Sequence, residues 1–209
     1  MFDIHTHNKL LIHNPNAIVN CNADDDFSPH PLFSLGFHPW DVDAMWESGF
    51  EKIEQSLLHI ESKGLLSKLA AIGEIGLDKN RGGSMQAQTD CFRRMLGLAD
   101  RYAKPVILHC VKAVDEILLI LNEENFSLPV VFHGFRGKPE QARQLLNKGF
   151  YLSFGPKFND ESIKLAYEAK RMFLETDDSR VGIEDVYELA GKALSISPTD
   201  ISVPGIFTS

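Results

Sequence analysis

The stretch that decides the fold is Leu69-Ala70-Ala71-Ile72-Gly73-Glu74-Ile75-Gly76-Leu77-Asp78. Its apolar start, residues 69–72, predicts a parallel strand that is buried on both faces and ends before Gly73. The charged Glu74 at the carboxyl end of such a strand does not fit a hydrophobic core. Barrels of parallel strands and helices place their catalytic residues at this end of the strands. We therefore expect a barrel whose functional site is built on strand ends.

The rest of the chain repeats this pattern of apolar runs separated by helical periodicity. Further strands are predicted at residues 2–7, 17–21, 32–36, 105–109, 129–133, 150–154 and 172–177. Helices are predicted at residues 41–62, 84–102, 114–121, 139–149, 159–170 and 183–194. Eight strands with mostly helical crossovers predict an α/β fold, a (β/α)8 TIM-type barrel, formed as a single domain over residues 1–209.

Two crossovers depart from the barrel pattern. Residues 8–16 and 22–31 are short and rich in Asn, Asp and Pro, whereas a parallel crossover normally needs about a dozen residues or more. We therefore predict that the first two outer helices are short or missing. The apolar outer wall would be less covered there, so we expect a second subunit in a homo-oligomer, or the C-terminal segment, to cover it.

Composition is typical of a globular protein, with 44% apolar and 24% charged residues. No apolar run approaches the ~20 residues that span a bilayer, and the first residues predict a strand rather than a basic and then apolar leader. Cys21, Cys91 and Cys110 are widely spaced and odd in number, which favours reduced thiols over disulfides. We expect a cytoplasmic protein that does not contact a membrane.

The formal net charge of −8 argues against a protein that coats duplex nucleic acid through a broad basic face. It leaves open a nuclease whose bound metal ions supply positive charge locally at the phosphate.

Side chains that commonly bind metals stand at the ends of five predicted strands. They are His5, His7, Glu74, His109, His133 and Asp177. Because the strand ends of a barrel converge on one mouth, these side chains are predicted to meet. Imidazoles and carboxylates suit Zn²⁺, Mn²⁺, Fe²⁺ or Co²⁺, and the carboxylates are also compatible with Mg²⁺. The sequence therefore predicts a metal site.

Several motifs resemble one family of enzymes. They are Asp3-x-His5-x-His7, Gly36-Phe37-His38-Pro39, Gly73-Glu74-Ile75-Gly76-Leu77-Asp78, Pro105-Val106-Ile107-Leu108-His109, His133-Gly134-Phe135-Arg136-Gly137 and Leu174-Glu175-Thr176-Asp177. In this order, and over nearly the whole chain, they resemble the TatD-type metal-dependent deoxyribonucleases. That family is a branch of the amidohydrolase-like metal-dependent hydrolases.

The resemblance implies two divalent metal ions, Mg²⁺, Mn²⁺ or Zn²⁺, and a role for each strand-end residue. Glu74 would bridge the ions, and Asp177 would orient or deprotonate the attacking water. Asp3 would support the ligands of the first strand, and His38 would face the substrate. The first ion would be held by His5, His7, Glu74 and Asp177, and the second by Glu74, His109 and His133.

The chain departs from the family pattern at positions expected to touch phosphate or base. Val111 stands where the family usually has Arg, and Gly134 and Arg136 stand where it usually has Cys and Ser. All the implied metal ligands are kept. Lys112, Arg136 and Arg180 are candidates to restore phosphate contacts from shifted positions.

Three functions are compatible with these residues. The first is a phosphodiester hydrolase, a deoxyribonuclease that acts on DNA ends or single strands. The second is a metal-dependent hydrolase of a small amide, ester or lactone. Glu74 on the fourth strand, with no Lys at the end of the fifth, favours the deoxyribonuclease over this small-molecule hydrolase. The third is a non-catalytic metal-binding barrel, against which the retained Asp177 argues, because a structural metal needs neither an open position nor a base.

Overall fold

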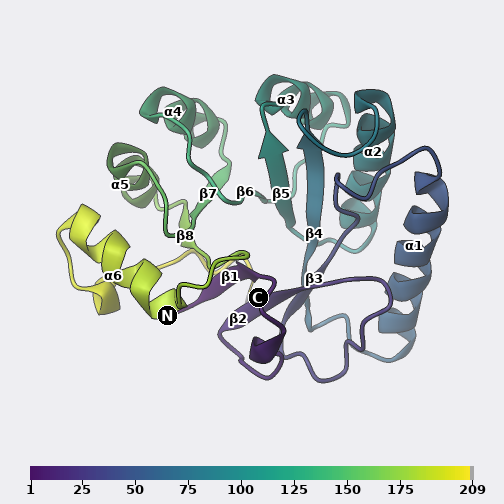
Figure 1. The fold of residues 1–209 in the computed structure, drawn as a ribbon, viewed down its shortest axis with the longest axis horizontal. Coiled ribbons are helices and arrows are strands. Elements are labelled where there is room, and N and C mark those ends of the chain that lie inside the picture. The colour runs from purple at the N-terminus through teal and green to yellow at the C-terminus, as the bar shows by residue number, and fades with distance from the viewer. Residues whose placement is uncertain (208–209) are drawn as a thin grey trace.

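The computed structural model describes residues 1–207, which form a parallel eight-stranded barrel with helices outside it (Figure 1). The strands are β1 Asp3–Thr6, β2 Ala17–Cys21, β3 Phe33–Leu35, β4 Leu69–Asp78, β5 Val106–Val111, β6 Val130–Phe132, β7 Tyr151–Phe154 and β8 Met172–Leu174. The helices are α1 Trp46–Ser62, α2 Met85–Arg101, α3 Val114–Glu123, α4 Pro139–Asn147, α5 Asp160–Glu168 and α6 Ile183–Leu194. Two 3-10 turns, η1 Lys9–Leu11 and η2 Pro198–Asp200, complete the described elements.

The strands pair in sequence order from β1 to β8, and every pair is parallel. Hydrogen bonds from Asp177 N–H to His5 O (2.9 Å) and from His7 N–H to Asp177 O (3.0 Å) join the segment that follows β8 to the end of β1. The predicted barrel is therefore confirmed, and its closure lies beside two of the predicted site residues.

Two hydrophobic clusters divide the core. One combines strand residues with residues of α1 to α6 and fills the space between the barrel and its helices. The other contains no helix residue and fills the barrel interior. Its buried members are Ile4, Ile18, Ala70, Ala71, Ile107, Val131, Phe173 and Phe207. Side chains two residues further along several of these strands lie at the barrel mouth, because side chains on a strand alternate between its faces.

The first two outer helices are missing, as predicted. The β1–β2 crossover contains only η1, and the β2–β3 crossover consists of turns (Figure 1). Lys9 ties the two crossovers together, because its Nζ donates to Asn20 O (2.9 Å) and Asp25 Oδ2 (2.6 Å). No residue of β1 is exposed, so the barrel wall is covered there within one chain. A subunit contact near Leu10, which is 91% exposed, stays a prediction.

The C-terminal segment lies elsewhere than we expected. Phe207 packs on Phe173 inside the barrel at a ring-centroid distance of 5.3 Å, with Val203 and Ile206 beside it. Phe2 and Tyr151, at the amino ends of β1 and β7, border the same cluster. Residues 203–207 therefore close the amino end of the barrel, opposite the mouth, rather than cover the outer wall.

Three element bounds differ from the prediction by more than two residues. Helix α1 begins at Trp46 rather than residue 41, because the Asp43 side chain accepts the Met45 N–H (2.7 Å) and holds a turn. Strand β4 continues through its glycines to Asp78, past the predicted end at residue 72. Strand β8 ends at Leu174 rather than residue 177, where Asp177 has a φ of +54°.

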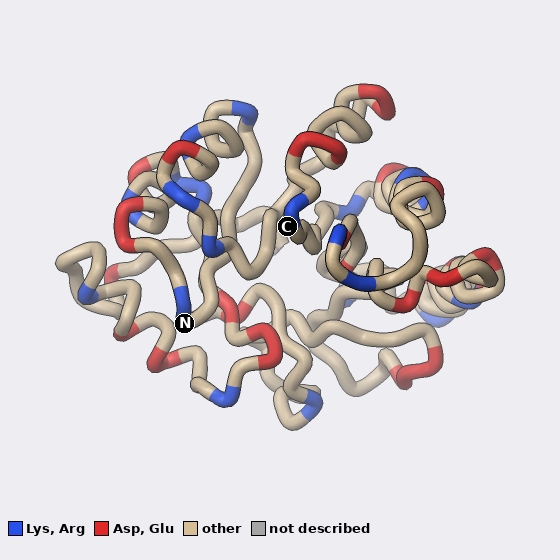
Figure 2. Tube along the Cα trace, turned by 45° about the horizontal axis from the view of Figure 1, so that its top comes forward, with Lys and Arg blue, Asp and Glu red and all other residues tan. Residues whose placement is uncertain are grey.

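The described residues contain no helix with the length and apolar character needed to cross a membrane. Figure 2 shows basic and acidic residues interspersed along the chain. Together with the net charge of −8, this distribution agrees better with the expected lack of a broad basic face than with a single basic face.

Candidate metal centre

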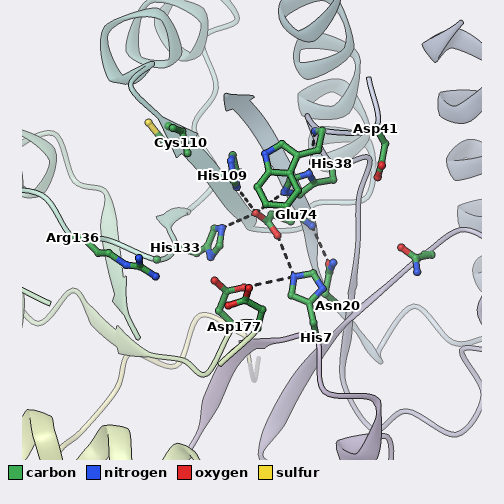
Figure 3. Close-up of a pocket in the computed structure, with 15 residues that line it drawn as sticks. His7, Asn20, His38, Asp41, Glu74, His109, Cys110, His133, Arg136 and Asp177 are labelled. Carbon is green, nitrogen blue, oxygen red and sulfur yellow. Dashed lines mark hydrogen bonds and ion pairs between the residues drawn. The ribbon is translucent and has the colours of Figure 1, made fainter. Parts of the chain in front are cut away.

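Glu74 stands at the centre of the barrel mouth, between two groups of histidines (Figure 3). Its Oε2 lies 3.2 Å from His5 Nε2 and 3.4 Å from His7 Nε2. Its Oε1 lies 2.6 Å from His109 Nδ1 and 2.7 Å from His133 Nε2. The two oxygens of one carboxylate therefore face two separate groups of imidazoles.

Asp177 belongs to the His5 and His7 side of the centre. Its Oδ1 lies 3.8 Å from His5 Nε2 and 3.7 Å from His7 Nε2. The backbone hydrogen bonds to β1 fix Asp177 in a left-handed conformation that is uncommon for a residue other than glycine. Such strain is kept where the surrounding structure holds it, often at functional sites.

All six strand-end residues that the sequence predicts are brought together. Compact groups of potential ligand atoms, each within 4.8 Å of one another, occur in the described residues as His5–His7–Asp177, His5–Glu74–His133, His38–Glu74–His109 and His133–Glu175–Asp177. His5 adds an independent sign, since both of its ring nitrogens are buried and neither makes a hydrogen bond. An unsatisfied buried polar group is costly, and a cation would coordinate it. The donor set thus fits a divalent metal ion.

The electrostatics of the centre favour an anionic Glu74. Burial opposes its charge, but His133 and the contacts from His109 and His38 hold the pKa of Glu74 well below its usual range. Burial likewise disfavours the charged form of His133, yet Glu74 and Glu175 raise its pKa well above the ordinary value. Contact with Glu74 raises the pKa of His7 as well. Glu74 is therefore held as an anion among the histidines, which suits the binding of a cation beside it.

Two carboxylates orient the histidines from behind. Glu175 Oε1 accepts the Gly134 N–H (2.7 Å) and lies 3.2 Å from His133 Nδ1, which leaves Nε2 of that ring toward Glu74. Asp78 Oδ2 lies 3.0 Å from His109 Nε2, which leaves Nδ1 toward Glu74. Carboxylates in this arrangement commonly fix the orientation of metal-binding imidazoles.

Sequence reasoning did not assign roles to Glu175, Asp78, Asn20 or Trp40. Asn20 follows Ile18 by two residues on β2, and its Oδ1 accepts the Glu74 N–H (3.1 Å). Trp40 donates its indole N–H to Asp78 Oδ2 (2.6 Å) although it is 46% exposed. Strand alternation applied to Ile18 and Phe173 could have identified Asn20 and Glu175 as residues facing the mouth.

The predicted substrate contacts occupy different places. His38 Nε2 lies 3.0 Å from Glu74 Oε1, and Arg136 lines the cavity of about 610 Å³ over the centre. Lys112 lines a neighbouring cavity instead. Arg180 is exposed and lines neither of these two cavities. Asp3 bonds to Thr176, through the Thr176 N–H (3.0 Å) and hydroxyl (2.7 Å), and so supports the junction of β1 with the segment after β8.

Comparison with known proteins places this centre in a family. The model of the TatD related DNase family matches residues 3–180. The chain belongs to the TatD related DNase family. The resemblance predicted from the sequence motifs is thus confirmed.

The relatives of this TatD-family chain include metal-dependent hydrolases and nucleases. It is 33% identical over 153 residues to "Uncharacterized metal-dependent hydrolase YabD" of Bacillus subtilis, which covers 72% of the chain and 56% of the relative. It is 34% identical over 153 residues to "3'-5' ssDNA/RNA exonuclease TatD" of Cronobacter turicensis, with 69% and 56% covered. The alignments thus span little more than half the length of these curated relatives.

Solved structures show the same fold. A TatD family hydrolase from Entamoeba histolytica matches with a TM-score of 0.77 at 18% identity, covering 96% of this chain and 93% of that one. YjjV, a TatD homologue from Escherichia coli, matches with a TM-score of 0.72 at 20% identity and the same coverage.

Proposed function

We propose that this TatD-family protein is a divalent-metal-dependent phosphodiester hydrolase that acts on DNA ends or single strands. The observation that carries the proposal is the position of Glu74, whose two carboxylate oxygens face separate groups of histidines. A bridging carboxylate suits two cations about 3.5–4 Å apart, the separation used to clamp the oxygens of a phosphodiester. Relatives named as 3'-5' ssDNA/RNA exonucleases support this class of substrate.

The residues would hold the metal ions in two groups. The first group is His5, His7, Asp177 and Glu74 Oε2, and the second is His109, His133 and Glu74 Oε1. Divalent ions bound there would neutralise charge on the phosphate and lower the pKa of water. Mg²⁺, Mn²⁺ and Zn²⁺ all remain candidates for this set of donors.

Asp177 is the proposed general base. Its carboxylate is 25% exposed, so water can reach it, whereas Glu74 is nearly buried beneath it. The Asp177 N–H donates to His5 O, and the Asp177 carbonyl accepts the His7 N–H. Because both backbone groups are bonded to the first strand segment, the carboxylate is held in a fixed position. It would orient the attacking water and accept its proton.

His38 and Arg136 would bind and orient the phosphate from opposite sides of the mouth. His38 follows β3 and contacts Glu74, while Arg136 follows β6 and extends toward the space between His133 and Asp177 (Figure 3). Arg136 thus places a positive charge locally at the pocket, and long duplexes should bind weakly to a chain of net charge −8.

The proposal is tested by measuring nucleotide release from end-labelled single-stranded DNA with Mg²⁺, Mn²⁺ or Zn²⁺ added. We expect metal-dependent cleavage by the wild type. Asp177→Asn should retain metal and lose about 10²–10⁴-fold in rate, and Glu74→Ala should be inactive. Glu188→Ala and Asp200→Asn, which remove exposed carboxylates that do not line the cavity over the centre, should cleave normally.

Two other outcomes would favour a different function. A wild-type protein that binds metal but cleaves no nucleic acid would contradict the proposal and favour a hydrolase of a small amide, ester or lactone. Metal binding without hydrolysis of any of these substrates would favour a non-catalytic barrel.

A further inference from the structure

A second cavity adjoins the metal centre. It has a volume of about 510 Å³, within the range of about 300–1,000 Å³ that is usual for small-molecule sites. It lies outside the strand ends, between the loops that lead into α3 and α4. It shares with the first cavity the residues Cys110, Val111, His133, Gly134 and Arg136. The second cavity therefore adjoins the first along these shared residues.

The walls of the second cavity combine an apolar floor with free amides. Phe132, Phe135 and Leu145 supply the buried apolar surface. Gln141 and Gln144 on α4 line the rim, and neither side-chain amide hydrogen-bonds to another residue in the range 1–207. An amide offers both a donor and an acceptor, the combination that pairs with the edge of a nucleobase.

The charges of the second cavity favour an anionic ligand, whereas the first cavity is lined by the carboxylates of the metal centre. Lys112 and Arg136 are exposed, and neither forms an ion pair with another described residue. Lys79 also lines the cavity, but Glu116 pairs with it. Asp115 is the remaining Asp, Glu, Lys or Arg residue of this lining, so the unpaired charges of these four residue types sum to one positive charge in the second cavity. Arg136 lines both cavities, and Figure 3 shows its side chain extending toward His133.

We propose that the second cavity is a subsite for the nucleotide next to the scissile phosphate. Its base would lie over the apolar floor beside the two glutamine amides, and Lys112 and Arg136 would contact the phosphate that joins it to the rest of the strand. This inference rests on the proposed phosphodiesterase function and goes beyond it. It makes the preferred substrate a single-stranded chain of several nucleotides rather than a mononucleotide ester, because only a chain occupies both cavities.

The test compares two substrates of the metal-loaded protein. The p-nitrophenyl ester of thymidine 5'-phosphate supplies one nucleotide, and a short oligothymidylate supplies its neighbours as well. We expect kcat/KM to be higher for the oligothymidylate. Lys112→Met should lower the ratio of oligothymidylate to ester kcat/KM by at least about tenfold, because it removes a charged hydrogen-bond donor to the phosphate. Gln144→Glu, which places an isosteric negative charge on the rim, should lower this ratio too.

Salt dependence gives a second readout. Removing one phosphate contact to a single strand should reduce the slope of log kcat/KM against log salt by about 0.7. Lys112→Met should show this reduction with the oligothymidylate, whereas the matched controls Lys164→Met and Gln55→Glu, at exposed positions on α5 and α1, should match the wild type in ratio and slope.

The outcomes separate the two proposals. Hydrolysis of both substrates with no gain from chain length, or with Lys112→Met indistinguishable from Lys164→Met, would overturn the subsite and leave the phosphodiesterase intact. Failure of the wild type to hydrolyse either substrate would overturn the proposed function, and the subsite with it.

Discussion

At the scale of single residues, Glu175 shows how a buried carboxylate can act through a neighbour. It is fully buried, and its Oε1 contacts both the Gly134 N–H and His133 Nδ1. Burial disfavours its charge, but the proximity of His133 lowers the pKa of Glu175. The carboxylate therefore fixes which nitrogen of His133 faces Glu74.

Glu175→Gln should weaken metal binding while the fold is retained. The amide keeps the size of the side chain but removes the charge that orients His133, and loss of such a contact typically costs 10–100-fold in metal affinity. Calorimetric titration with Mn²⁺ measures this. Glu188→Gln, an exposed residue of α6, is the matched control. Equal affinities for the two variants would show that His133 is positioned by other contacts.

At the scale of elements, β4 depends on glycine to bring Glu74 to the mouth. Gly76 has a φ of +143°, and a Cβ added there would lie 2.0 Å from His109 O on β5. Only glycine allows the two strands to approach this closely while β4 continues to Asp78. The strand thus carries Glu74 within its length instead of ending before it.

Gly76→Ala should destabilise the protein by at least about 2 kcal/mol, because strained backbone conformations alone cost about 1–3 kcal/mol. Gly97→Ala is the matched control. It lies within α2, where an added Cβ has no neighbour within 4 Å, and should stabilise by about 0.5–1 kcal/mol. Urea unfolding followed by circular dichroism measures both, and equal stabilities would contradict the role of Gly76.

The elements also show why the sequence predicted some of the site and missed the rest. His109 and His133 each stand at the end of a buried apolar run, and side chains on a strand alternate between its two faces. Because Ile107 and Val131 point into the barrel, the histidines two residues later were predictable on the same face. The continuation of β4 could not, because it depends on contacts of Gly76 with a strand more than thirty residues away. The roles of Glu175 and Asp78 likewise depend on which histidine each one meets across the barrel.

At the scale of the whole molecule, the two ends of the barrel have different functions. The mouth carries the charged centre, whereas residues 203–207 close the amino end with apolar side chains. Because the barrel interior lies directly between them, the packing of Phe207 on Phe173 supports the strands that carry the site.

Phe207→Ala should lower the free energy of unfolding by about 3 kcal/mol, as expected for truncation of a buried aromatic side chain. Leu10→Ala, at a residue that is 91% exposed, should change it by no more than about 0.5 kcal/mol. Denaturant unfolding of the two variants measures the difference. A Phe207→Ala variant as stable as Leu10→Ala would mean that the segment does not occupy the barrel in solution.

If Glu74 joins two metal sites, its removal should affect both. A calorimetric titration of the wild type and Glu74→Ala with Mn²⁺ measures this through the number of ions bound per chain and their affinities. We expect two ions for the wild type. For Glu74→Ala we expect an affinity at least about tenfold weaker at both sites, since each oxygen of Glu74 would supply a ligand to one ion. A wild type that binds no Mn²⁺, or a Glu74→Ala variant that binds two ions as tightly as the wild type, would contradict this role of Glu74.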